Sequence, residues 1–331
     1  MKQLQHLVTE SSRKPKIITQ DYTMPNGCVT PLVTRVGDGS IIKRFDKTPP
    51  PTKETDVVCP HFLELKWAHG CPFDCAWCYL KGTLRLLPEK TKPVVKDYRK
   101  IEEHVRTFLD SVDTPEEILN TGEIADSLMW EGTSEPFSKF IIPIFQEQRR
   151  HKVLFVTKSN NVKNLLEIRP PDQVIVSFSV NAPEVADRWE HKAPLVEKRI
   201  EAARSLSKAG YEVRVRIDPM VPVPGWERAY RKLTEHIFAE FVPARITLGS
   251  LRGLRSTING CKDKSWEQFL SDRSNWGKKV DFAARHEMYH MLVQVLTQEF
   301  DYKEVALCKE TIAMWRALGM DHTKIKCNCV W

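Results

Sequence analysis

Three cysteines lie close together in the sequence, at Cys71, Cys75 and Cys78. Their spacing, with three and then two residues between them, lets one compact loop turn three thiolates toward a common point. A closed tetrahedral zinc site needs four ligands, so this set is one ligand short. Three thiolates suit a [4Fe–4S] cluster in which one iron is left open. The pattern predicts an iron–sulfur loop, and three structural or zinc-binding cysteines are the alternative.

Length and composition limit the protein class. The 331 residues are 41% hydrophobic and 28% charged, which is ordinary for a globular protein. Neither a run of about 18 apolar residues nor a signal core follows Met1, so we expect a cytoplasmic protein with no membrane association. Nine cysteines without a secretory signal favour a reducing compartment. The net charge of +7 permits a nucleic-acid partner, which would lie in a folded groove because no basic arm is present.

The chain divides into three segments by composition. Residues 1–56 contain several glycines and three consecutive prolines, and are expected to form an irregular N-terminal extension. Residues 57–255 alternate short apolar runs with amphipathic stretches. In residues 256–331 this alternation fails, and a helix near Phe282–Glu299 leads to a cysteine-containing tail.

The middle segment predicts an α/β fold. Its best helical stretch is Leu195–Ala209, followed by Gly210 where a helix commonly ends. Strands that alternate with helices pair in parallel through right-handed crossovers. We therefore predict a partial (β/α)6 TIM-type barrel with N- and C-terminal extensions, whose chemistry lies at the C-terminal ends of the strands. The cysteine loop follows the first of six candidate strands, which are Phe62–Trp67, Glu117–Thr121, Lys152–Thr157, Gln173–Val180, Glu212–Ile217 and Arg245–Gly249.

Polar residues follow the later strands in register with that loop. Lys158 comes after the third strand and could pair with a carboxylate, although a solvated cap is the plainer explanation. Ser179 and Asn181 end the fourth strand and offer a hydroxyl and an amide to a ribose or a carboxylate.

These motifs together resemble a known family. The cysteine loop, with an aromatic residue before Cys78, resembles that of the radical S-adenosylmethionine (SAM) superfamily, and Gly122-Glu123 resembles the superfamily's Gly-Glu element. The series Cys-Tyr-Leu, Phe-Val-Thr-Lys, Phe-Ser-Val-Asn and Gly-Trp-Glu-Arg is similar to the spore photoproduct lyase family, which repairs a thymine dimer in spore DNA. The resemblance covers about residues 61–250.

The resemblance implies a radical SAM enzyme of the lyase or isomerase type. A [4Fe–4S] cluster on the three cysteines would bind SAM and cleave it reductively to a 5′-deoxyadenosyl radical. The resemblance also implies a nucleobase in DNA as substrate and an electron donor such as flavodoxin or ferredoxin, and we expect a monomer. It makes Tyr79 a catalytic candidate, as one of two aromatic residues, with Trp77, that flank Cys78. The implied SAM contacts are Gly122, Glu123, Lys158, Ser179 and Asn181.

One position departs from the family pattern. Spore photoproduct lyases place a hydrogen-donating cysteine after the second strand, where this chain has Glu123. A carboxylate cannot donate a hydrogen atom as a thiol does. The departure indicates a different substrate or a donor supplied from elsewhere in the chain.

Three cysteines near the end of the sequence could supply that chemistry. Cys327 and Cys329 stand one residue apart, and Cys308 precedes them. They could form a second metal site with a fourth ligand from another cysteine or a histidine. Alternatively, Cys327 and Cys329 act catalytically, as redox or hydrogen-donor thiols on a tail folded over the barrel mouth. Exposed, inert thiols are the third interpretation.

A second motif is a His-Glu-x-x-His sequence at His286, Glu287 and His290. In a helix it could place two imidazoles on one face as zinc ligands. The surrounding residues make an ordinary amphipathic helix, so a solvated histidine pair is the favoured interpretation.

Three functional classes follow from the sequence. The first is a radical SAM enzyme that acts on a nucleobase, the second a radical SAM enzyme that acts on a peptide or small metabolite, and the third a non-catalytic iron–sulfur or zinc protein that binds nucleic acid. For the first class we predict a basic groove at the barrel mouth that includes some of Arg214, Arg216, Arg252 and Arg255, with surface salt bridges as the alternative for these arginines.

Overall fold

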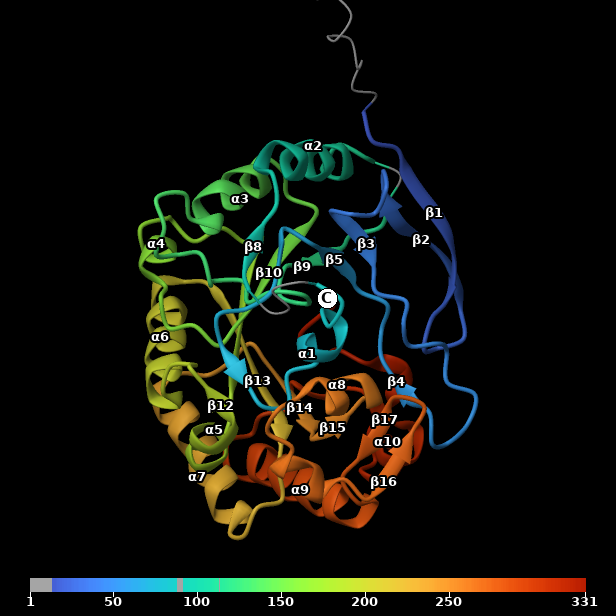
Figure 1. The fold of residues 1–331 in the computed structure, drawn as a ribbon, viewed down its shortest axis with the longest axis vertical. Coiled ribbons are helices and arrows are strands. Elements are labelled where there is room, and N and C mark those ends of the chain that lie inside the picture. Colours follow the sequence, from blue (N-terminus) through green and yellow to red (C-terminus); the bar gives the residue numbers. More distant parts are fainter. Residues whose placement is uncertain (1–13, 88–91, 113) are drawn as a thin grey trace, which may run out of the picture.

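The computed structural model describes residues 14–87, 92–112 and 114–331 (Figure 1). Its helices are α1 (Leu80–Thr83), α2 (Tyr98–Leu109), α3 (Phe137–Gln146), α4 (Lys163–Leu166), α5 (Pro183–Trp189), α6 (Val196–Ala209), α7 (Trp226–Glu240), α8 (Arg255–Gly260), α9 (Phe282–Gln294) and α10 (Ile312–Ala317). The longer strands are β1 (Ile17–Thr23), β2 (Val29–Val36), β10 (Lys152–Thr157), β11 (Val174–Val180), β13 (Glu212–Met220) and β14 (Arg245–Ser250). The three-residue strands are β3 (Ile42–Arg44), β5 (Leu63–Leu65), β9 (Ile118–Asn120), β16 (Asp272–Ser274), β17 (Gly277–Lys279) and β18 (Val305–Leu307). The two-residue strands are β4 (Val57–Val58), β6 (Ala68–His69), β7 (Asp74–Cys75), β8 (Val94–Val95), β12 (Glu190–His191), β15 (Arg252–Gly253) and β19 (Glu310–Thr311).

A ten-stranded sheet forms the framework, in the order β1-β2-β3-β5-β9-β10-β11-β13-β14-β18. Every neighbouring pair from β5 to β18 is parallel. All seven residues of β11 are buried, as expected for a parallel strand covered on both faces. The predicted partial barrel and its six strands are confirmed. The sequence analysis missed β18, which adds a seventh parallel strand from the C-terminal segment.

Helices cover the outer side of this curved sheet. Figure 1 shows α2, α3, α4, α6 and α7 in an arc around the strands. The predicted helix is present as α6, with Ile200, Ala203 and Leu206 buried against the sheet. It ends at Gly210, whose φ of 102° lies in the left-handed region that glycine adopts without strain. None of the described helices has the length and apolar character needed to cross a bilayer.

The N-terminal extension contains strands, contrary to the expected irregular structure. β1 and β2 form an antiparallel ribbon, and β3 pairs with β5, so the ribbon extends the barrel sheet at its edge. The β-branched residues of both strands favour this pairing, while Gly37 and Gly39, both with positive φ, occupy the turn between β2 and β3. The glycines therefore mark a turn and not a linker.

The C-terminal segment packs against the open side of the barrel. It includes a small antiparallel sheet, β15-β17-β16, and a short pairing between β19 and β4. The predicted helix in this region is confirmed as α9. The C label in Figure 1 lies near the centre of the ribbon, beside the strands of the barrel.

Candidate functional site

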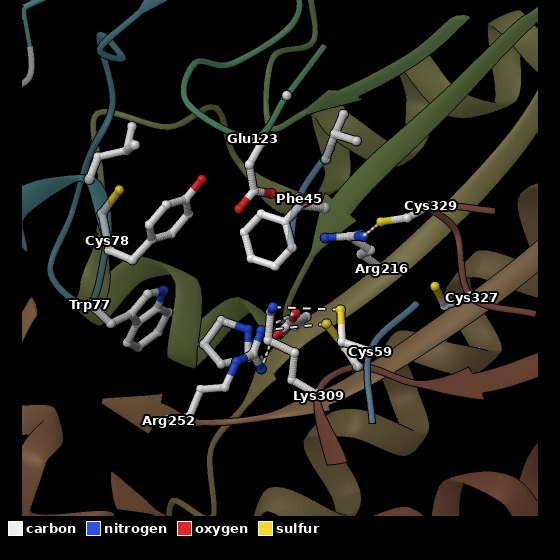
Figure 2. A pocket seen from close by; sticks show the side chains of 18 of the residues that line it. Phe45, Cys59, Trp77, Cys78, Glu123, Arg216, Arg252, Lys309, Cys327 and Cys329 are labelled. Atoms are coloured by element: carbon white, nitrogen blue, oxygen red, sulfur yellow. Dashed lines mark hydrogen bonds and ion pairs between the residues drawn. The ribbon is translucent and has the colours of Figure 1, made fainter. Parts of the chain in front are cut away.

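A cavity of about 320 Å³ lies inside the barrel. Its lining combines the cysteine loop, the strand ends, the N-terminal extension and the C-terminal segment (Figure 2). Many residues singled out from the sequence line it together, among them Cys71, Cys75, Trp77, Cys78, Tyr79, Gly122, Glu123, Lys158, Ser179, Arg216, Arg252, Cys308, Cys327 and Cys329. Parallel strands bring residues far apart in sequence to one end of the barrel, which explains this convergence.

The cysteine loop is held in place by the segment after the fourth barrel strand. Cys75 in β7 pairs with Glu190 in β12 in an antiparallel bridge. The backbone amide of Ala76 donates to the carbonyl of Trp189 at 2.7 Å. The Trp77 ring packs against Trp189 with 5.5 Å between centroids. The loop is thus fixed before any cofactor binds.

The three cysteine thiols fit a cluster better than a single ion. All three line the cavity, yet within the described part of the chain no three His, Cys, Asp or Glu side chains lie close enough to hold one metal ion. In a [4Fe–4S] cluster each thiolate ligates a different iron, so the sulfurs stand farther apart than the ligands of one ion. Burial raises the pKa of Cys75 to about 12 and also raises that of Cys71, so cluster binding must displace thiol protons.

Gly122 and Glu123 follow closely after the end of β9, as the sequence suggested. A Cβ at Gly122 would lie 2.6 Å from Val156 Cβ, so only glycine allows the backbone to run there. Burial raises the pKa of Glu123 to about 7, against the opposing effect of Lys309. Burial, together with the nearby Glu123 carboxylate, raises the pKa of the Tyr79 hydroxyl. Both side chains line the cavity, where they are available to a ligand.

Lys158 lines the cavity but already has a partner. Its ammonium donates to Glu190 at 2.8 Å, and Arg199 contacts the other oxygen of the same carboxylate at 2.5 Å. Burial alone would raise the pKa of Glu190, but the two cations hold it below its ordinary value. The solvated cap considered for Lys158 is wrong, because it forms part of a buried ion cluster. Sequence reasoning missed Glu190, which carried no motif of its own.

The two residues from the fourth strand separate in the structure. Ser179 lines the cavity, whereas Asn181 is fully buried and absent from the lining. The Asn181 amide donates to the Pro219 carbonyl at 2.8 Å, and its oxygen accepts from the Tyr230 hydroxyl at 3.0 Å. The structure corrects the expectation that Asn181 contacts SAM, because its amide group joins Pro219 in β13 to Tyr230 in α7 and does not reach the cavity.

The tail that carries Cys327 and Cys329 does not fold over the barrel mouth, as one interpretation had it. It enters the barrel from the opposite end, where Arg245, the first residue of β14, donates to the Cys327 carbonyl at 2.9 Å. Both thiols are buried and line the cavity, so the third interpretation, exposed and inert thiols, is wrong. Cys308 lines the same cavity, but these thiols form no group that could ligate one ion among the described residues.

Of the four arginines proposed for a basic groove, Arg216 and Arg252 line the cavity, and Arg214 and Arg255 do not. Arg214 is buried at the base of the barrel, and Arg216 donates to Cys329 inside the cavity. Arg252 forms a two-point ion pair with Asp218, with both distances 2.9 Å. Only Arg255 is exposed. The arginines face inward because residues of one strand alternate between its faces, and Arg214, Arg216 and Asp218 share the inner face of β13.

One part of the cavity wall is aromatic and cationic. Lys309 lies 3.8 Å from the Trp276 centroid and 4.2 Å from that of Phe45. Its ammonium also contacts Thr48 Oγ1 at 3.3 Å and Cys59 Sγ at 3.6 Å. No motif in the sequence indicates this wall, since its members come from residues 45–59, 276 and 309.

The His-Glu-x-x-His motif lies in α9, away from the cavity lining. The rings of His286 and His290 stack with centroids 5.6 Å apart. Because the described residues contain no three-ligand group, this pair is not part of a metal site there. The favoured interpretation, a histidine pair at the helix surface, agrees with His290 being exposed.

Comparison with known proteins now bears on this site. The family model described as "Spore photoproduct lyase" matches residues 61–248, the segment that contains the cysteine loop and the six predicted strands. The chain belongs to the spore photoproduct lyase family. The protein of this name from Bacillus subtilis (strain 168) is 30% identical over 181 residues, which is 53% of this chain and 50% of the relative. The chain therefore spans about half the length of that curated relative.

Solved structures of the family share the fold. A spore photoproduct lyase complexed with dinucleoside spore photoproduct superimposes with a TM-score of 0.63 at 20% identity, over 74% of this chain and 75% of the other. A variant with bound AdoMet and dinucleoside spore photoproduct gives a TM-score of 0.60 at 20% identity, over the same shares. At this identity the likeness establishes the barrel architecture. The extensions at both ends of this chain complete its cavity beyond the matched segment.

Proposed function

We propose that this protein is a radical SAM enzyme that acts on a modified or damaged nucleobase, most simply in DNA. The proposal rests on one observation: three cysteine thiols, Glu123 and Tyr79 meet in a single cavity inside a parallel barrel. When bound, a [4Fe–4S] cluster and SAM would supply a 5′-deoxyadenosyl radical by one-electron cleavage of SAM. The protein's own task is then to orient SAM and the substrate and to exclude water.

The cavity residues divide this task. Cys71, Cys75 and Cys78 would hold the cluster, on a loop already fixed by β12. Gly122 allows close approach of the backbone, and Glu123 is placed to accept hydrogen bonds from an ammonium. Ser179 offers a hydroxyl to the bound cofactor. The Lys158 ammonium, which pairs with Glu190, would also contact the carboxylate of SAM. Tyr79, flanking the cluster loop, would stand between cofactor and substrate.

The aromatic wall supports a planar substrate. Phe45 and Trp276 flank the Lys309 ammonium. Figure 2 shows Phe45 and Lys309 near the middle of the cavity, with Trp77 and Cys78 to one side of them. Aromatic side chains bind nucleobases by stacking, which contributes about 1–3 kcal/mol per base. A base in a duplex would have to leave the stack to reach this cavity, at a cost of a few kcal/mol. Exposed cations such as Arg255 would contact the phosphates of the substrate. A flavodoxin- or ferredoxin-type protein would donate the electrons, and the enzyme would act as a monomer.

The experiment that tests the proposal is anaerobic reconstitution followed by turnover. Protein loaded with iron and sulfide is reduced with dithionite, given SAM, and assayed for 5′-deoxyadenosine and methionine. We expect release from the wild type and none from the Cys71→Ala variant. Absence of both products from fully loaded wild-type protein would exclude a radical SAM enzyme and favour the non-catalytic iron–sulfur protein.

The substrate class needs a separate measurement. Binding of a fluorescent oligonucleotide is measured at several salt concentrations, because phosphate contacts make affinity fall with rising salt. We expect binding at low salt that weakens steeply as salt is added. SAM cleavage without any oligonucleotide binding would favour a peptide or a small metabolite as the substrate.

A further inference from the structure

Residues 326–331 form a plug in the base of the barrel. Arg214 donates to the carbonyls of Asn328 and Val330 at 3.0 and 2.8 Å, and Arg245 donates to that of Val330 at 2.8 Å. At the same end, the Lys152 ammonium lies 5.0 Å from the centroid of the Trp331 ring. These contacts come from residues near the N-terminal ends of β10, β13 and β14. The plug is therefore a built part of the cavity floor.

Asn328 fixes the conformation of the plug between its two cysteines. Its side chain is completely buried and donates to Ser177 Oγ at 2.9 Å and to the Val215 carbonyl at 2.8 Å. Its side-chain oxygen accepts from Thr247 Oγ1 at 2.8 Å. All its hydrogen bonds go to the barrel wall. Cys327 and Cys329, one residue to either side, are thereby held beside each other at the cavity.

The two thiols have different surroundings. Arg216 Nη2 donates a hydrogen bond to Cys329 Sγ at 2.8 Å, and Asn120 Nδ2 lies 3.7 Å from the same sulfur. The neighbouring Cys327 thiol and the Arg216 guanidinium lower the pKa of Cys329 to about 6, against the effect of burial, while Cys329 and burial raise the pKa of Cys327. The guanidinium at 2.8 Å therefore favours the thiolate at Cys329 and the thiol at Cys327.

Other charged groups around the pair do not reverse this assignment. Lys309 favours the Cys329 thiolate, whereas Cys59 is one of the groups that raise the pKa of Cys327. Glu123, near the same sulfur, has a pKa of about 7 and so carries only part of a negative charge at neutral pH. The third cavity cysteine of this segment, Cys308, has a different partner, because its sulfur accepts a hydrogen bond from Arg252 at 3.5 Å.

We propose that Cys327 and Cys329 act as a thiol–thiolate pair that quenches a carbon-centred radical on the substrate. This inference rests on the proposed radical function. The S–H bond of Cys327 breaks and a C–H bond forms on the substrate, leaving a sulfur radical. That radical shares its electron with the Cys329 thiolate, so a three-electron S–S bond forms and the single negative charge is conserved. A one-electron acceptor of the ferredoxin class removes the surplus electron, and an external dithiol reopens the resulting disulfide.

The position of the pair suits this role. Figure 2 shows Cys327, Cys329 and Arg216 across the cavity from Trp77 and Cys78, with Glu123 between the two sides. A substrate in the cavity would lie between the cofactor side and the thiols. Glu123 itself cannot donate a hydrogen atom, so the plug supplies the thiol that this strand end lacks.

The first test needs no cofactor or substrate. Alkylation of each cysteine by iodoacetamide is followed by mass spectrometry in the wild type, in Arg216→Gln and in Arg216→Lys. At pH 7 the Cys329 rate should fall by about tenfold or more in Arg216→Gln, because only the thiolate reacts. Arg216→Lys should keep most of the reactivity, and exposed Cys28 should be unaffected in both. A Cys329 rate that does not depend on Arg216 overturns the inference.

The second test follows the hydrogen atom. Reduced holoenzyme with SAM is given dinucleoside spore photoproduct as the probe in D2O, where thiols carry deuterium. The wild type should place one deuterium in the product. Cys327→Ser and Cys329→Ser should still release 5′-deoxyadenosine but lose this deuterium, while Cys28→Ser behaves as wild type. Unchanged deuterium in Cys327→Ser overturns the inference and leaves the proposed function standing. If the wild type releases no 5′-deoxyadenosine, the proposed function is overturned instead. The alkylation experiment then remains as the test of the cysteine pair.

Discussion

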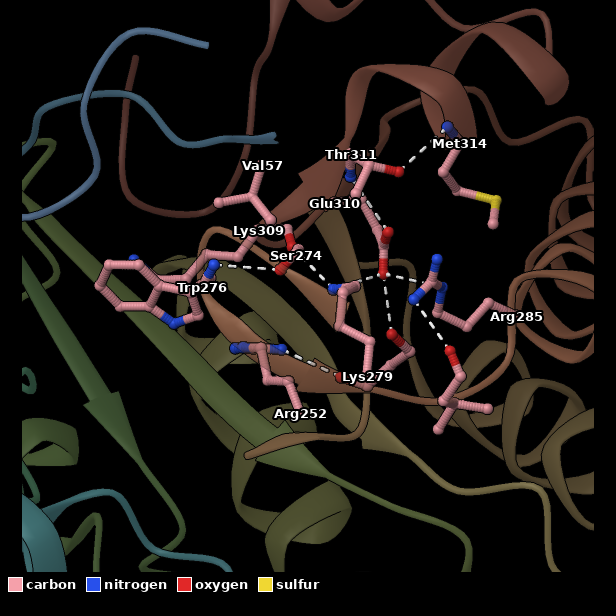
Figure 3. Close-up of polar contacts among 12 residues, drawn as sticks. Val57, Arg252, Ser274, Trp276, Lys279, Arg285, Lys309, Glu310, Thr311 and Met314 are labelled. Atoms are coloured by element: carbon pink, nitrogen blue, oxygen red, sulfur yellow. Dashed lines mark hydrogen bonds and ion pairs between the residues drawn. The ribbon is translucent and has the colours of Figure 1, made fainter. Parts of the chain in front are cut away.

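Lys279 Nζ and Glu310 Oε1 lie 2.9 Å apart with both side chains completely buried (Figure 3). Lys279 also donates to the Lys309 carbonyl at 3.0 Å. Lys309 has a φ of 48°, which is uncommon for a residue other than glycine, and its ammonium lies over the Trp276 ring. The buried pair therefore holds the backbone that directs Lys309 into the cavity.

Removing one member of this pair should destabilise the fold. Glu310→Gln leaves Lys279 buried without its carboxylate partner, while Arg285 keeps Asp272 at 3.1 Å. We expect a loss of about 3–5 kcal/mol, because an unpaired buried charge is strongly destabilising. Urea unfolding followed by circular dichroism measures the change. The control is Asp301→Asn, which breaks an exposed ion pair with Lys303 and should change stability by less than about 0.5 kcal/mol. Equal effects of the two variants would contradict the role assigned to the buried pair.

The cluster should depend on each of the three loop cysteines. After anaerobic reconstitution the wild type should be brown, with broad visible absorbance and bound iron and sulfide. Alanine at Cys71, Cys75 or Cys78 should abolish both signals, since a site with two thiolates cannot hold the cluster. Cys28→Ala, at an exposed position outside the cavity, should retain them. Full cluster content in a Cys75→Ala variant would disprove the assignment of the loop.

SAM binding should depend on Glu123 more than on Lys158. Glu123→Gln removes a charge with no ion-pair partner at hydrogen-bond distance among the described residues, so SAM affinity in the reconstituted protein should fall about tenfold or more. Lys158→Met should weaken binding less but lower the unfolding free energy, because Glu190 loses one of its two cations. Equilibrium dialysis and urea unfolding separate the two effects. Wild-type affinity in Glu123→Gln would remove that residue from the SAM site.

The ionisation of Glu123 should also give stability a specific pH dependence. Its pKa is raised from an ordinary value near 4.5 to about 7, chiefly by burial. The folded protein then binds more protons than the unfolded chain between these values, so this residue's contribution to stability falls as pH rises from about 4.5 to 7. Because the cavity admits water to Glu123, we expect a loss of only about 1–3 kcal/mol across this window.

Glu123→Gln tests that sign directly. The variant carries no titrating carboxyl, so its unfolding free energy should gain on the wild type as the pH is raised from 5 to 7. Unfolding curves at both pH values, recorded on cofactor-free protein, give the difference. A wild type that gains stability relative to the variant over this range would show that the carboxylate is stabilised, not penalised, in the cavity.

Much of the fold could be predicted from local patterns. The six barrel strands and α6 are short-range features, set by apolar periodicity and by the glycine at the end of the helix. The cysteine loop was equally visible, because its three ligands lie within eight residues. Gly122-Glu123 and Ser179 were found because parallel topology sends every strand's C-terminal end to one place. The strands of the N-terminal extension were missed, since glycine and proline obscured a ribbon that is stabilised by pairing with β5.

The rest of the site depends on contacts between distant segments. Glu190 pairs with Lys158, Lys309 reaches Phe45, and Arg216 meets Cys329 across more than a hundred residues of chain. The sequence showed that Cys327 and Cys329 were unusual, but not that they face the cavity from the barrel floor. The end from which the C-terminal tail enters the barrel and the charges that surround its two cysteines are set by the packing of the folded chain. The thiolate of Cys329 is favoured because the Arg216 guanidinium lies beside it, against the opposing effect of burial, and only the tertiary structure brings these two residues together.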